Sequence, residues 1–252
     1  MGLIIFIFGL IFGSFYNVVG LRLPNNESIV KPGSHCPKCN HKLSWYENIP
    51  ILSYLFLGGK CKECKNPISI IYPLIEFLTG VLFLISYLIF GISEQFFIGL
   101  VLSSLVVIIF VSDSKYMIIL DSPLVISSVL ILIIKYYYHG ISAVGSSLLS
   151  GIIVFAAMYI LMLLGNFMFK KESLGGGDIK LSFVSGLSLG TYLGLFYIVL
   201  GAFFAFPYAL YVTIKKKESM LPFGPFLAIS MLIIYFNLEK VTELLKIVLN
   251  LN

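Results

Sequence analysis

An acidic residue preceded by three glycines lies between two apolar segments of this chain. The segment reads Leu174-Gly175-Gly176-Gly177-Asp178-Ile179-Lys180. A carboxylate at the centre of a bilayer is unfavourable by roughly 2.5 to 3.5 kcal/mol, so an acid at such a place needs a reason. One hypothesis is a catalytic carboxylate whose glycines let another backbone, such as that of a substrate, approach closely. The other is a glycine-rich turn whose acid caps the next helix.

Catalysis of the aspartic type requires a second carboxylate. Two acids that share one proton titrate apart, so one can act as base and the other as acid. Asp113 follows a mostly apolar run from 96 to 112, which places it at the same membrane face as Asp178. Asp121 follows eight residues later and is a weaker candidate. The alternative for Asp113 is a solvated acid at the end of a span, paired with Lys115.

The four cysteines form two Cys-x-x-Cys pairs that 21 residues separate. Two such pairs supply four thiolates, the ligand set of a structural zinc site of the zinc-ribbon type. Two disulfides are the alternative, which a reducing cytoplasm disfavours. The neighbouring His35 and His41 are expected on the loop surface, because the thiolate set is complete. We therefore expect one structural zinc ion, held by Cys36, Cys39, Cys61 and Cys64.

Composition determines the class of protein. Hydrophobic residues make up 59% and charged residues 12% of 252, against roughly 45 to 50% and 25% in soluble domains. A soluble chain of this length could not bury so much apolar surface, so the sequence predicts an all-α polytopic membrane protein whose partner is the lipid bilayer. In a membrane protein the net charge of +5 says little about nucleic acid, and no nucleic-acid partner is expected. About eight transmembrane helices are expected, near 2–21, 73–91, 96–112, 120–138, 142–167, 179–190, 191–214 and 221–237.

The only long polar segment, 22–72, follows the first span and holds seven of the 17 basic residues. The positive-inside rule places this loop in the cytoplasm and the N-terminus outside. No removable signal peptide is expected, since no positive charge precedes the first span. The sequence thus divides into a first transmembrane helix (1–21), a cytoplasmic zinc-binding loop (22–72), a transmembrane core that carries the candidate acids (73–237) and an amphipathic tail (238–252) on the outer surface.

Basic residues elsewhere bear on this orientation. The segments 113–119, 168–178 and 215–220 fall on the cytoplasmic side in this scheme and carry further lysines, including Lys115, Lys170, Lys171, Lys215, Lys216 and Lys217. Three lysines fall on the outer side and weaken the scheme, namely Lys135, Lys240 and Lys246.

A set of short motifs runs through nearly the whole chain in a fixed order. They include Gly13-Ser14-Phe15-Tyr16-Asn17, Ser34-His35-Cys36-Pro37-Lys38-Cys39, Glu47-Asn48-Ile49-Pro50, Tyr72-Pro73-Leu74-Ile75-Glu76, Gly175-Gly176-Gly177-Asp178-Ile179-Lys180-Leu181 and Pro222-Phe223-Gly224-Pro225-Phe226. In these the chain resembles the type IV prepilin peptidases, polytopic aspartic proteases also called prepilin leader peptidases/N-methyltransferases. The chain departs from the family pattern at Leu120, where the family has proline, and at Ile71, where arginine is common.

This resemblance implies roles for particular residues. Asp178, in a Gly-x-Gly-Asp motif formed with Gly175 and Gly177, and Asp113 would be the two catalytic aspartates. The resemblance also marks Lys180 and Glu76 as supporting residues of their motifs. Contacts for the basic leader of a substrate would come from Glu47, Glu63 and Glu76, and the alternative for Glu76 is a hydrogen bond within the helix bundle.

The resemblance further implies an activity. Members cleave a short basic leader from prepilins or pilin-like proteins at the cytoplasmic face of the bacterial inner membrane. Many then methylate the new N-terminus with S-adenosylmethionine, although no glycine-rich nucleotide fingerprint marks a methyl-donor site here. The alternative is a non-enzymatic membrane scaffold whose zinc loop docks a cytoplasmic partner, a function for which an acid pair is not needed.

Overall fold

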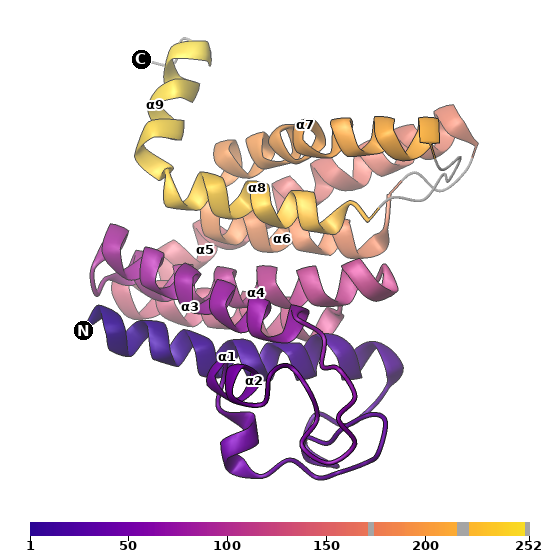
Figure 1. Cartoon of the computed structure of the whole chain (residues 1–252). Helices are drawn as coiled ribbons and strands as arrows, with labels where there is room; N and C mark the ends of the chain where they lie inside the picture. Colours follow the sequence, from indigo (N-terminus) through magenta and orange to yellow (C-terminus); the bar gives the residue numbers. More distant parts are fainter. Residues whose placement is uncertain (171–173, 216–221, 250–252) are drawn as a thin grey trace. The chain divides into compact units, whose positions relative to one another are not determined.

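The computed structural model describes residues 1–170, 174–215 and 222–249, and Figure 1 shows them as helices joined by short connections and one long loop. Two compact units, Met1–Ile92 and Ser93–Asn252, divide the chain. Over the described ranges the only extended pairing is a pair of isolated bridges, His35 with Lys42 and Lys60 with Pro67. The predicted all-α class is confirmed.

Two long helices form the body of the first unit. They are α1, Gly2–Arg22, and α3, Ile71–Phe90, which lie side by side (Figure 1). A Cβ on Gly9 would lie 2.6 Å from the Cα of Gly80, and one on Gly13 would lie 2.8 Å from the Cα of Glu76. Small residues let membrane helices approach this closely, so the α1–α3 contact depends on these glycines.

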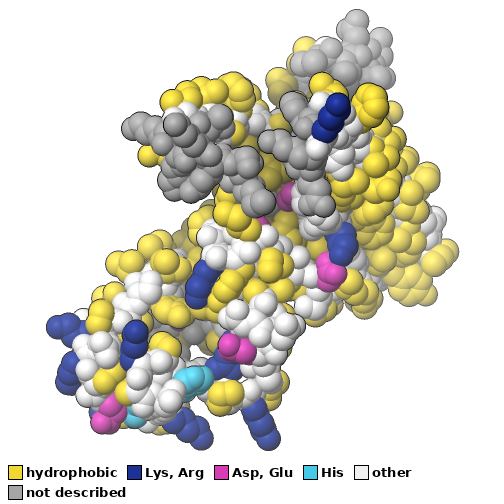
Figure 2. Space-filling model, turned by 90° about the vertical axis from the view of Figure 1, so that its right-hand side faces the viewer, with side chains coloured by type: hydrophobic (Ala, Val, Ile, Leu, Met, Phe, Trp, Pro, Cys, Tyr) yellow, Lys and Arg dark blue, Asp and Glu magenta, His cyan; other side chains and the backbone are white. Residues whose placement is uncertain are grey.

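The loop between α1 and α3 contains three short helical segments, η1 (Leu23–Asn25), η2 (Trp45–Asn48) and α2 (Leu52–Phe56). Arg22 fixes the chain where it leaves α1, because its guanidinium donates to the carbonyls of Ser28, Pro32 and Gly33. Lys and Arg side chains gather over this loop in the lower part of Figure 2. The loop is thus the polar segment that the sequence predicts.

The second unit consists of six helices in the part of the chain that the structure describes. Their bounds are α4 Glu94–Tyr116, α5 Asp121–Phe169, α6 Gly176–Leu189, α7 Thr191–Lys215, α8 Gly224–Phe236 and α9 Leu238–Leu249. The 49 residues of α5 are two helices joined at Gly140, which has φ 75° and ψ −168°. Glycine permits this conformation because it has no Cβ. The break separates the two spans expected at 120–138 and 142–167.

Each of the eight expected spans contains a helix in the residues that the structure describes. Five helices of the described residues are long and apolar enough to cross a membrane, or six if α8 and α9, bent by 93°, are one broken span. Among these five is α5, which the break at Gly140 divides in two. The 14 residues of α6 and 13 of α8 extend only about 20 Å each, less than the ~30 Å hydrocarbon core.

The expected amphipathic tail is the helix α9 as far as Leu249, and it turns away from α8 (Figure 1). Three parts of the sequence-based scheme lie outside the described residues. They are Lys171 in 171–173, Lys216 and Lys217 together with the first residue of the span expected at 221–237 in 216–221, and the tail end at 250–252.

Lys135, which the orientation scheme places on the outer side, has a structural role within α5. Its ammonium donates to the hydroxyl of Ser147 at 2.9 Å, across the break at Gly140. Nearby in sequence, His139 pairs with Glu94 at 2.6 Å between Nε2 and Oε2. These contacts join the two halves of α5 to each other and to the start of α4.

The short helix α6 packs tightly against α5. A Cβ on Gly186 would lie 2.6 Å from the carbonyl oxygen of Ser150 and 2.7 Å from the Cα of Gly151. Backbone atoms cannot move aside as the end of a long side chain can. The close approach of these two helices therefore fixes the position of α6 and of Asp178 in its first turn.

We predict that Gly186→Ala destabilises the second unit, because its methyl group overlaps the backbone of α5. Overpacking of this kind costs about 1 to 3 kcal/mol. The matched control is Gly145→Ala, since a Cβ at this helical glycine meets nothing within 4 Å. In detergent, the unfolding midpoint should fall for Gly186→Ala and stay level or rise for Gly145→Ala. Equal midpoints for the two variants would contradict the packing argument.

Candidate active site and metal site

The two Cys-x-x-Cys pairs form two similar turns in the loop of the first unit. In the first, the Cys36 N–H donates to the His41 carbonyl, and in the second the Cys61 N–H donates to the Asn66 carbonyl, both at 2.9 Å. The residue after each second cysteine, Asn40 and Lys65, has φ 57°. Each turn thus repeats the same backbone geometry and presents two thiols on one side.

The four sulfurs come together from the two turns. Cys36 Sγ lies 3.8 Å from Cys64 Sγ, and Cys39 Sγ lies 3.9 Å from Cys61 Sγ. All four lie within 4.8 Å of one another, so the cluster is able to hold one metal ion. No disulfide joins them. The predicted grouping of these cysteines is therefore present in the structure.

Hydrogen bonds favour the thiolate form at one of these cysteines. The backbone N–H of Asn66 and then its side-chain amide, 3.3 Å from Sγ, lower the pKa of Cys64 to about 6. A thiolate is the form in which cysteine binds a metal. His41 is directed elsewhere, with its Nε2 3.2 Å from Glu47 Oε2. The expectation that the histidines are not needed as ligands agrees with this cluster of four sulfurs.

Glu47 lies inside the loop rather than on its surface. Its carboxylate accepts the Ser44 N–H at 2.8 Å, which forms a capping box at the start of η2. The backbone of Ser44 and, to a smaller extent, His41 hold the pKa of Glu47 below its usual range. With 6% of its surface exposed, Glu47 contributes to loop structure and is a poor contact for a substrate cation.

The two aspartates lie at helix ends of the second unit. Asp113 occupies the last turn of α4, where the Met117 N–H donates to its carbonyl at 2.9 Å. Asp178 is the third residue of α6, and its carboxylate accepts a hydrogen bond from the backbone of Gly175. A carboxylate in the first turn is favoured by the unpaired N–H groups and the helix dipole. The hypothesis that Asp178 stabilises the start of the next helix therefore agrees with its position, but it accounts for only one of the two carboxylate oxygens.

Capping does not satisfy either acid completely. Only 5% of Asp113 and 6% of Asp178 are exposed. Oδ2 of Asp113 and Oδ1 of Asp178 are buried with no hydrogen-bond partner, and the two carboxylates are close enough to interact electrostatically. A buried charge without partners is strongly unfavourable. The pair is therefore energetically unfavourable. Buried acids of this kind are typical of sites that transfer a proton or activate a water molecule.

Two glycines allow an isoleucine side chain to pack close to the acids. A Cβ on Gly224, the first residue of α8, would lie 3.1 Å from Oδ2 of Asp113 and 2.7 Å from Cδ1 of Ile119. A Cβ on Gly177 would lie 2.6 Å from Cβ of the same Ile119. The first turns of α6 and α8 thus both pack against Ile119, which lies three residues beyond the end of α4. Gly177 of the Gly-x-Gly-Asp motif therefore makes room for Ile119 and not for a substrate. A Cβ on the preceding Gly176 would meet no atom within 4 Å.

A buried hydroxyl network supports the helix that carries Asp178. Ser182 donates to the Asp178 carbonyl at 3.0 Å and lies 2.9 Å from the Tyr197 hydroxyl. Ser230 of α8 donates to the Tyr197 carbonyl at 3.0 Å. Because Tyr197 is fully buried, these contacts connect α6, α7 and α8 beneath the acid pair.

The other ionisable residues near the motif are at the surface. Lys180 and Asp121 form an exposed ion pair, with Nζ 2.7 Å from Oδ1. Asp121 therefore lacks the burial that sets the other two acids apart. Lys115, the expected partner of Asp113 in the alternative interpretation, lies over the ring of Tyr116 at 5.1 Å. The hypothesis of a solvated Asp113 paired with Lys115 is wrong.

Comparison of the sequence with known proteins identifies the family to which the chain belongs. The Bacterial Peptidase A24 N-terminal domain matches residues 7–90, and the Type IV leader peptidase family matches residues 100–210. The prepilin leader peptidase/N-methyltransferase of Bacillus subtilis is 36% identical over 236 residues, 92% of each chain. That of Vibrio cholerae is 32% identical over 245 residues, 92% of this chain and 95% of the relative. This chain belongs to the type IV leader peptidase family.

A third relative is similar over a shorter stretch. The prepilin leader peptidase/N-methyltransferase of Myxococcus xanthus is 38% identical over 174 residues, 69% of this chain, and the match spans about half of that relative. No solved structure matches. The two family matches fall one in each compact unit. In this leader peptidase the cysteine cluster therefore belongs to the first family domain and the acid pair to the second.

Glu76 of this leader peptidase holds a strained turn of the loop. Its Oε2 accepts the Ile51 N–H at 2.8 Å, and its carboxylate also bonds to Ser14. Ile51 has φ 60° and ψ −50°, and the Leu52 N–H donates to the Pro50 carbonyl. This is the rare γ-turn with positive φ, a strained conformation for a β-branched residue. Glu76 thus makes a contact within the unit, one of the two roles that the sequence leaves open.

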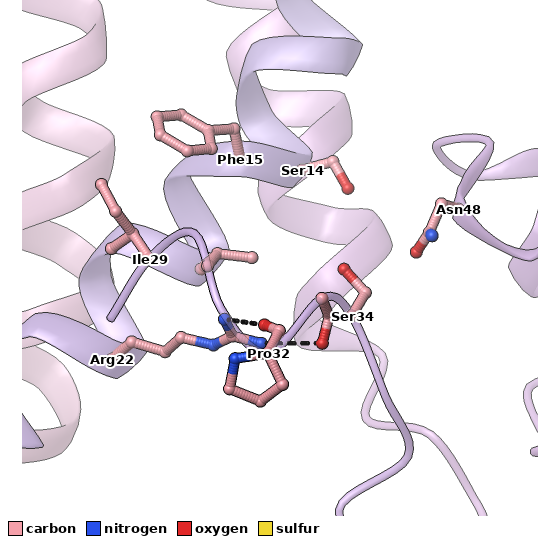
Figure 3. Close-up of a pocket in the computed structure, with 9 residues that line it drawn as sticks. Ser14, Phe15, Arg22, Ile29, Pro32, Ser34 and Asn48 are labelled. Carbon is pink, nitrogen blue, oxygen red and sulfur yellow. Dashed lines mark hydrogen bonds between the residues drawn. The ribbon is translucent and has the colours of Figure 1, made fainter. Parts of the chain in front are cut away.

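A pocket of about 310 Å³ lies where the loop leaves α1 (Figure 3). Ser14, Ser34 and Asn48 supply its polar lining, and Phe15 adds an aromatic ring. Arg22 also borders the pocket, but its guanidinium bonds to loop carbonyls, as the dashed lines in Figure 3 show. The pocket therefore offers hydroxyls and an amide rather than an available charge.

Sequence reasoning identified both acids and all four cysteines but not the residues that enclose the acids. Gly224 lies in the motif Pro222-Phe223-Gly224-Pro225-Phe226, but nothing in the sequence places it, Ile119 or Tyr197 near the acids. A tyrosine in an apolar helix has the same sequence pattern whether its hydroxyl is buried or at an interface. Only the packing of α6, α7 and α8 distinguishes the two.

We predict that Glu76→Ala loosens the loop around Ile51, because the strained turn loses the acceptor of its N–H. Hydrogen exchange measured by mass spectrometry should become faster over residues 49–57. Glu27→Ala is the matched control, since Glu27 is an exposed acid of the same loop. Exchange over 49–57 that is unchanged in Glu76→Ala would show that other contacts hold the turn.

Proposed function

We propose that this leader peptidase cleaves the basic leader from prepilins or pilin-like proteins, with Asp113 and Asp178 as its catalytic pair. The observation that carries the proposal is the pair of buried, partnerless carboxylate oxygens at the adjoining ends of α4 and α6. The relatives in Bacillus subtilis and Vibrio cholerae bear the name of this activity. A membrane scaffold has no use for two unsatisfied acids.

The mechanism follows from the sharing of one proton. Two neighbouring carboxylates hold a single proton between them, so one is a base while the other is an acid. The base would take a proton from water as the water attacks the scissile carbonyl, and the acid would protonate the departing amine. Gly175 orients Asp178 through its backbone hydrogen bond, and the Ser182–Tyr197 network holds α6 in place. Lys180 and Asp121 form an exposed ion pair between α6 and the start of α5, which contributes little to the stability of α6.

The orientation in a bacterial inner membrane follows from charge. The loop of 22–72 carries seven of the 17 basic residues, so we place it in the cytoplasm and the N-terminus outside. Asp113, beyond the apolar part of α4, and Asp178, at the start of α6, then lie at the cytoplasmic face. A basic leader would remain in the cytoplasm during cleavage while the apolar helix of its substrate lies in the bilayer.

We assign structural zinc to the four cysteines. Four sulfurs about 2.3 Å from one zinc ion lie about 3.8 Å apart in a tetrahedron. The sulfurs of Cys36 and Cys64 lie 3.8 Å apart, those of Cys39 and Cys61 3.9 Å, and all four within 4.8 Å of one another. Such a site leaves no position for a catalytic water. Zinc would join the two turns and so fix the fold of the loop.

The second activity in the names of the relatives is methyl transfer, for which S-adenosylmethionine is the donor that family likeness implies. The pocket of Figure 3 does not fit this group on its own. Its lining contains no carboxylate for the positive charges of the donor, and Arg22 is already bonded to loop carbonyls. We therefore assign no residue of this pocket to methyl transfer.

We predict that Asp113→Asn and Asp178→Asn each abolish cleavage, because an amide cannot act as the base or supply the acidic proton. A loss of at least about 100-fold is expected for a residue in acid–base catalysis. Purified variants in detergent would be incubated with a prepilin-like substrate, and the product analysed by mass spectrometry. A methyl group added to the product in the presence of S-adenosylmethionine would report the second activity.

Asp121→Asn is the matched control, because it removes an exposed acid only eight residues after Asp113. It should cleave at close to the wild-type rate. Retained cleavage in both Asp113→Asn and Asp178→Asn would refute the aspartic mechanism. Absence of cleavage by wild-type protein with its metal bound would favour the scaffold.

We predict that the purified chain holds one zinc ion and that Cys61→Ser loses most of it, because three thiolates and a hydroxyl form a weaker site. Zinc would be measured by mass spectrometry of the metal after dialysis. The matched control is His35→Ala, whose ring bonds the Gly33 carbonyl in the same turn. A zinc content that is equal in wild type and Cys61→Ser would contradict the assignment.

A further inference from the structure

The polar loop of the first unit has an apolar surface that no part of the described structure covers. Four large side chains form it: Trp45 is 79% exposed, Leu52 50%, Leu55 66% and Phe56 85%. Trp45 begins η2 and the other three belong to α2, which packs against η2. We call this group the apolar lobe. Exposed apolar groups of this size on a polar domain mark a contact surface.

The lobe is attached to a membrane helix at a defined depth. The Ile51 N–H, just before α2, donates to Glu76 at 2.8 Å. Glu76 is the sixth residue of α3, which places it roughly 8 Å along the helix from its start. Since α3 is apolar and long enough to cross a membrane, α2 begins beside the first turns of a span.

The side chains on that part of α3 also lack a covering. Ile71 is 59% exposed, Leu74 56% and Phe77 52%. Side chains like these face lipid in a membrane-spanning helix. The apolar lobe is thus attached at the depth of a lipid-facing part of α3, where hydrocarbon gives way to headgroups.

Two lysines next to the apolar lobe are also consistent with a position at the membrane surface. Lys60 follows α2 and is exposed, and Lys62 donates to the hydroxyl of Tyr46, the neighbour of Trp45, at 2.8 Å. Lysines beside apolar anchors reach anionic headgroups. Tryptophan also prefers the membrane–water interface, where its ring is apolar and its N–H is hydrated.

We propose that the apolar lobe inserts into the interfacial layer of the bilayer and so docks the cysteine-containing loop on the membrane surface. Leu55 and Phe56 enter the outer part of the hydrocarbon, Trp45 lies among the headgroups, and Glu76 sets the position of α2 through Ile51. The occupant of this surface is lipid. The loop is then held at the membrane at three places, namely its connection to α1, its connection to α3 and the lobe between them.

Trp45 provides a direct test, because it is the only tryptophan of the chain. The full-length, metal-loaded protein would be placed in lipid nanodiscs, with or without bromine on the upper acyl chain of the lipids. Bromine quenches tryptophan on contact. We expect emission to fall in the brominated discs, and acrylamide in the water to quench it only weakly.

Two variants place the single tryptophan at other positions of the loop. In a Trp45→Phe background, Phe56→Trp places the only tryptophan on α2, where stronger quenching by brominated lipid is expected. The matched control, Glu63→Trp in the same background, places it on an exposed site of the second cysteine turn. This control should be quenched by acrylamide and not by lipid.

Two results would overturn the proposal. Quenching of Phe56→Trp by acrylamide but not by brominated lipid would show that the lobe faces water. Protection from both quenchers would show that protein, either the rest of the chain or another molecule, covers it. Bound metal, measured on the same samples, would confirm that each variant retains its loop fold.

Discussion

The placement of two carboxylates where neither is fully hydrogen bonded is the constraint on which the second unit depends. Asp113 and Asp178 are about 95% buried, and each has one oxygen without a partner. Such a pair persists only if the surrounding structure offsets the free-energy cost of burying carboxyl oxygens without hydrogen-bond partners. The tight α5–α6 contact at Gly186, the shared support on Ile119 and the hydroxyls around Tyr197 meet this requirement. Much of the packing of this unit thus serves one unfavourable site.

The first unit is held by different forces. Its helices meet through glycines that bring backbones together, and its loop has little apolar interior to stabilise it. Hydrogen bonds from Arg22 and to Glu47 and Glu76 fix separate parts of the loop. A metal at the cysteines would join the two turns in the same way. Stabilisation by a few specific polar contacts explains how a loop of this size can expose large apolar side chains.

Much of this could be predicted from the sequence, and the reasons are physical. Apolar runs of about 20 residues indicate membrane helices because the bilayer has a fixed thickness. Cysteine spacing predicts a metal cluster because four thiolates must meet at one point. The acids stood out because a charge near hydrocarbon is unfavourable. The enclosure by Ile119 and Gly224 was not predictable, since it depends on how the ends of α4, α6 and α8 meet. The strained turn at Ile51 was equally hidden, because isoleucine rarely adopts positive φ.

The division into two units has a consequence for biosynthesis. All contacts among α1, the loop and α3 are made by the first 92 residues, which leave the ribosome before any part of α4. Domains generally fold in the order of their synthesis. The first helix pair can therefore enter the membrane and close around its cysteine turns while the acid-bearing helices are still being translated. An early hairpin with a metal bound would keep the four free cysteines from forming disulfides during the rest of synthesis.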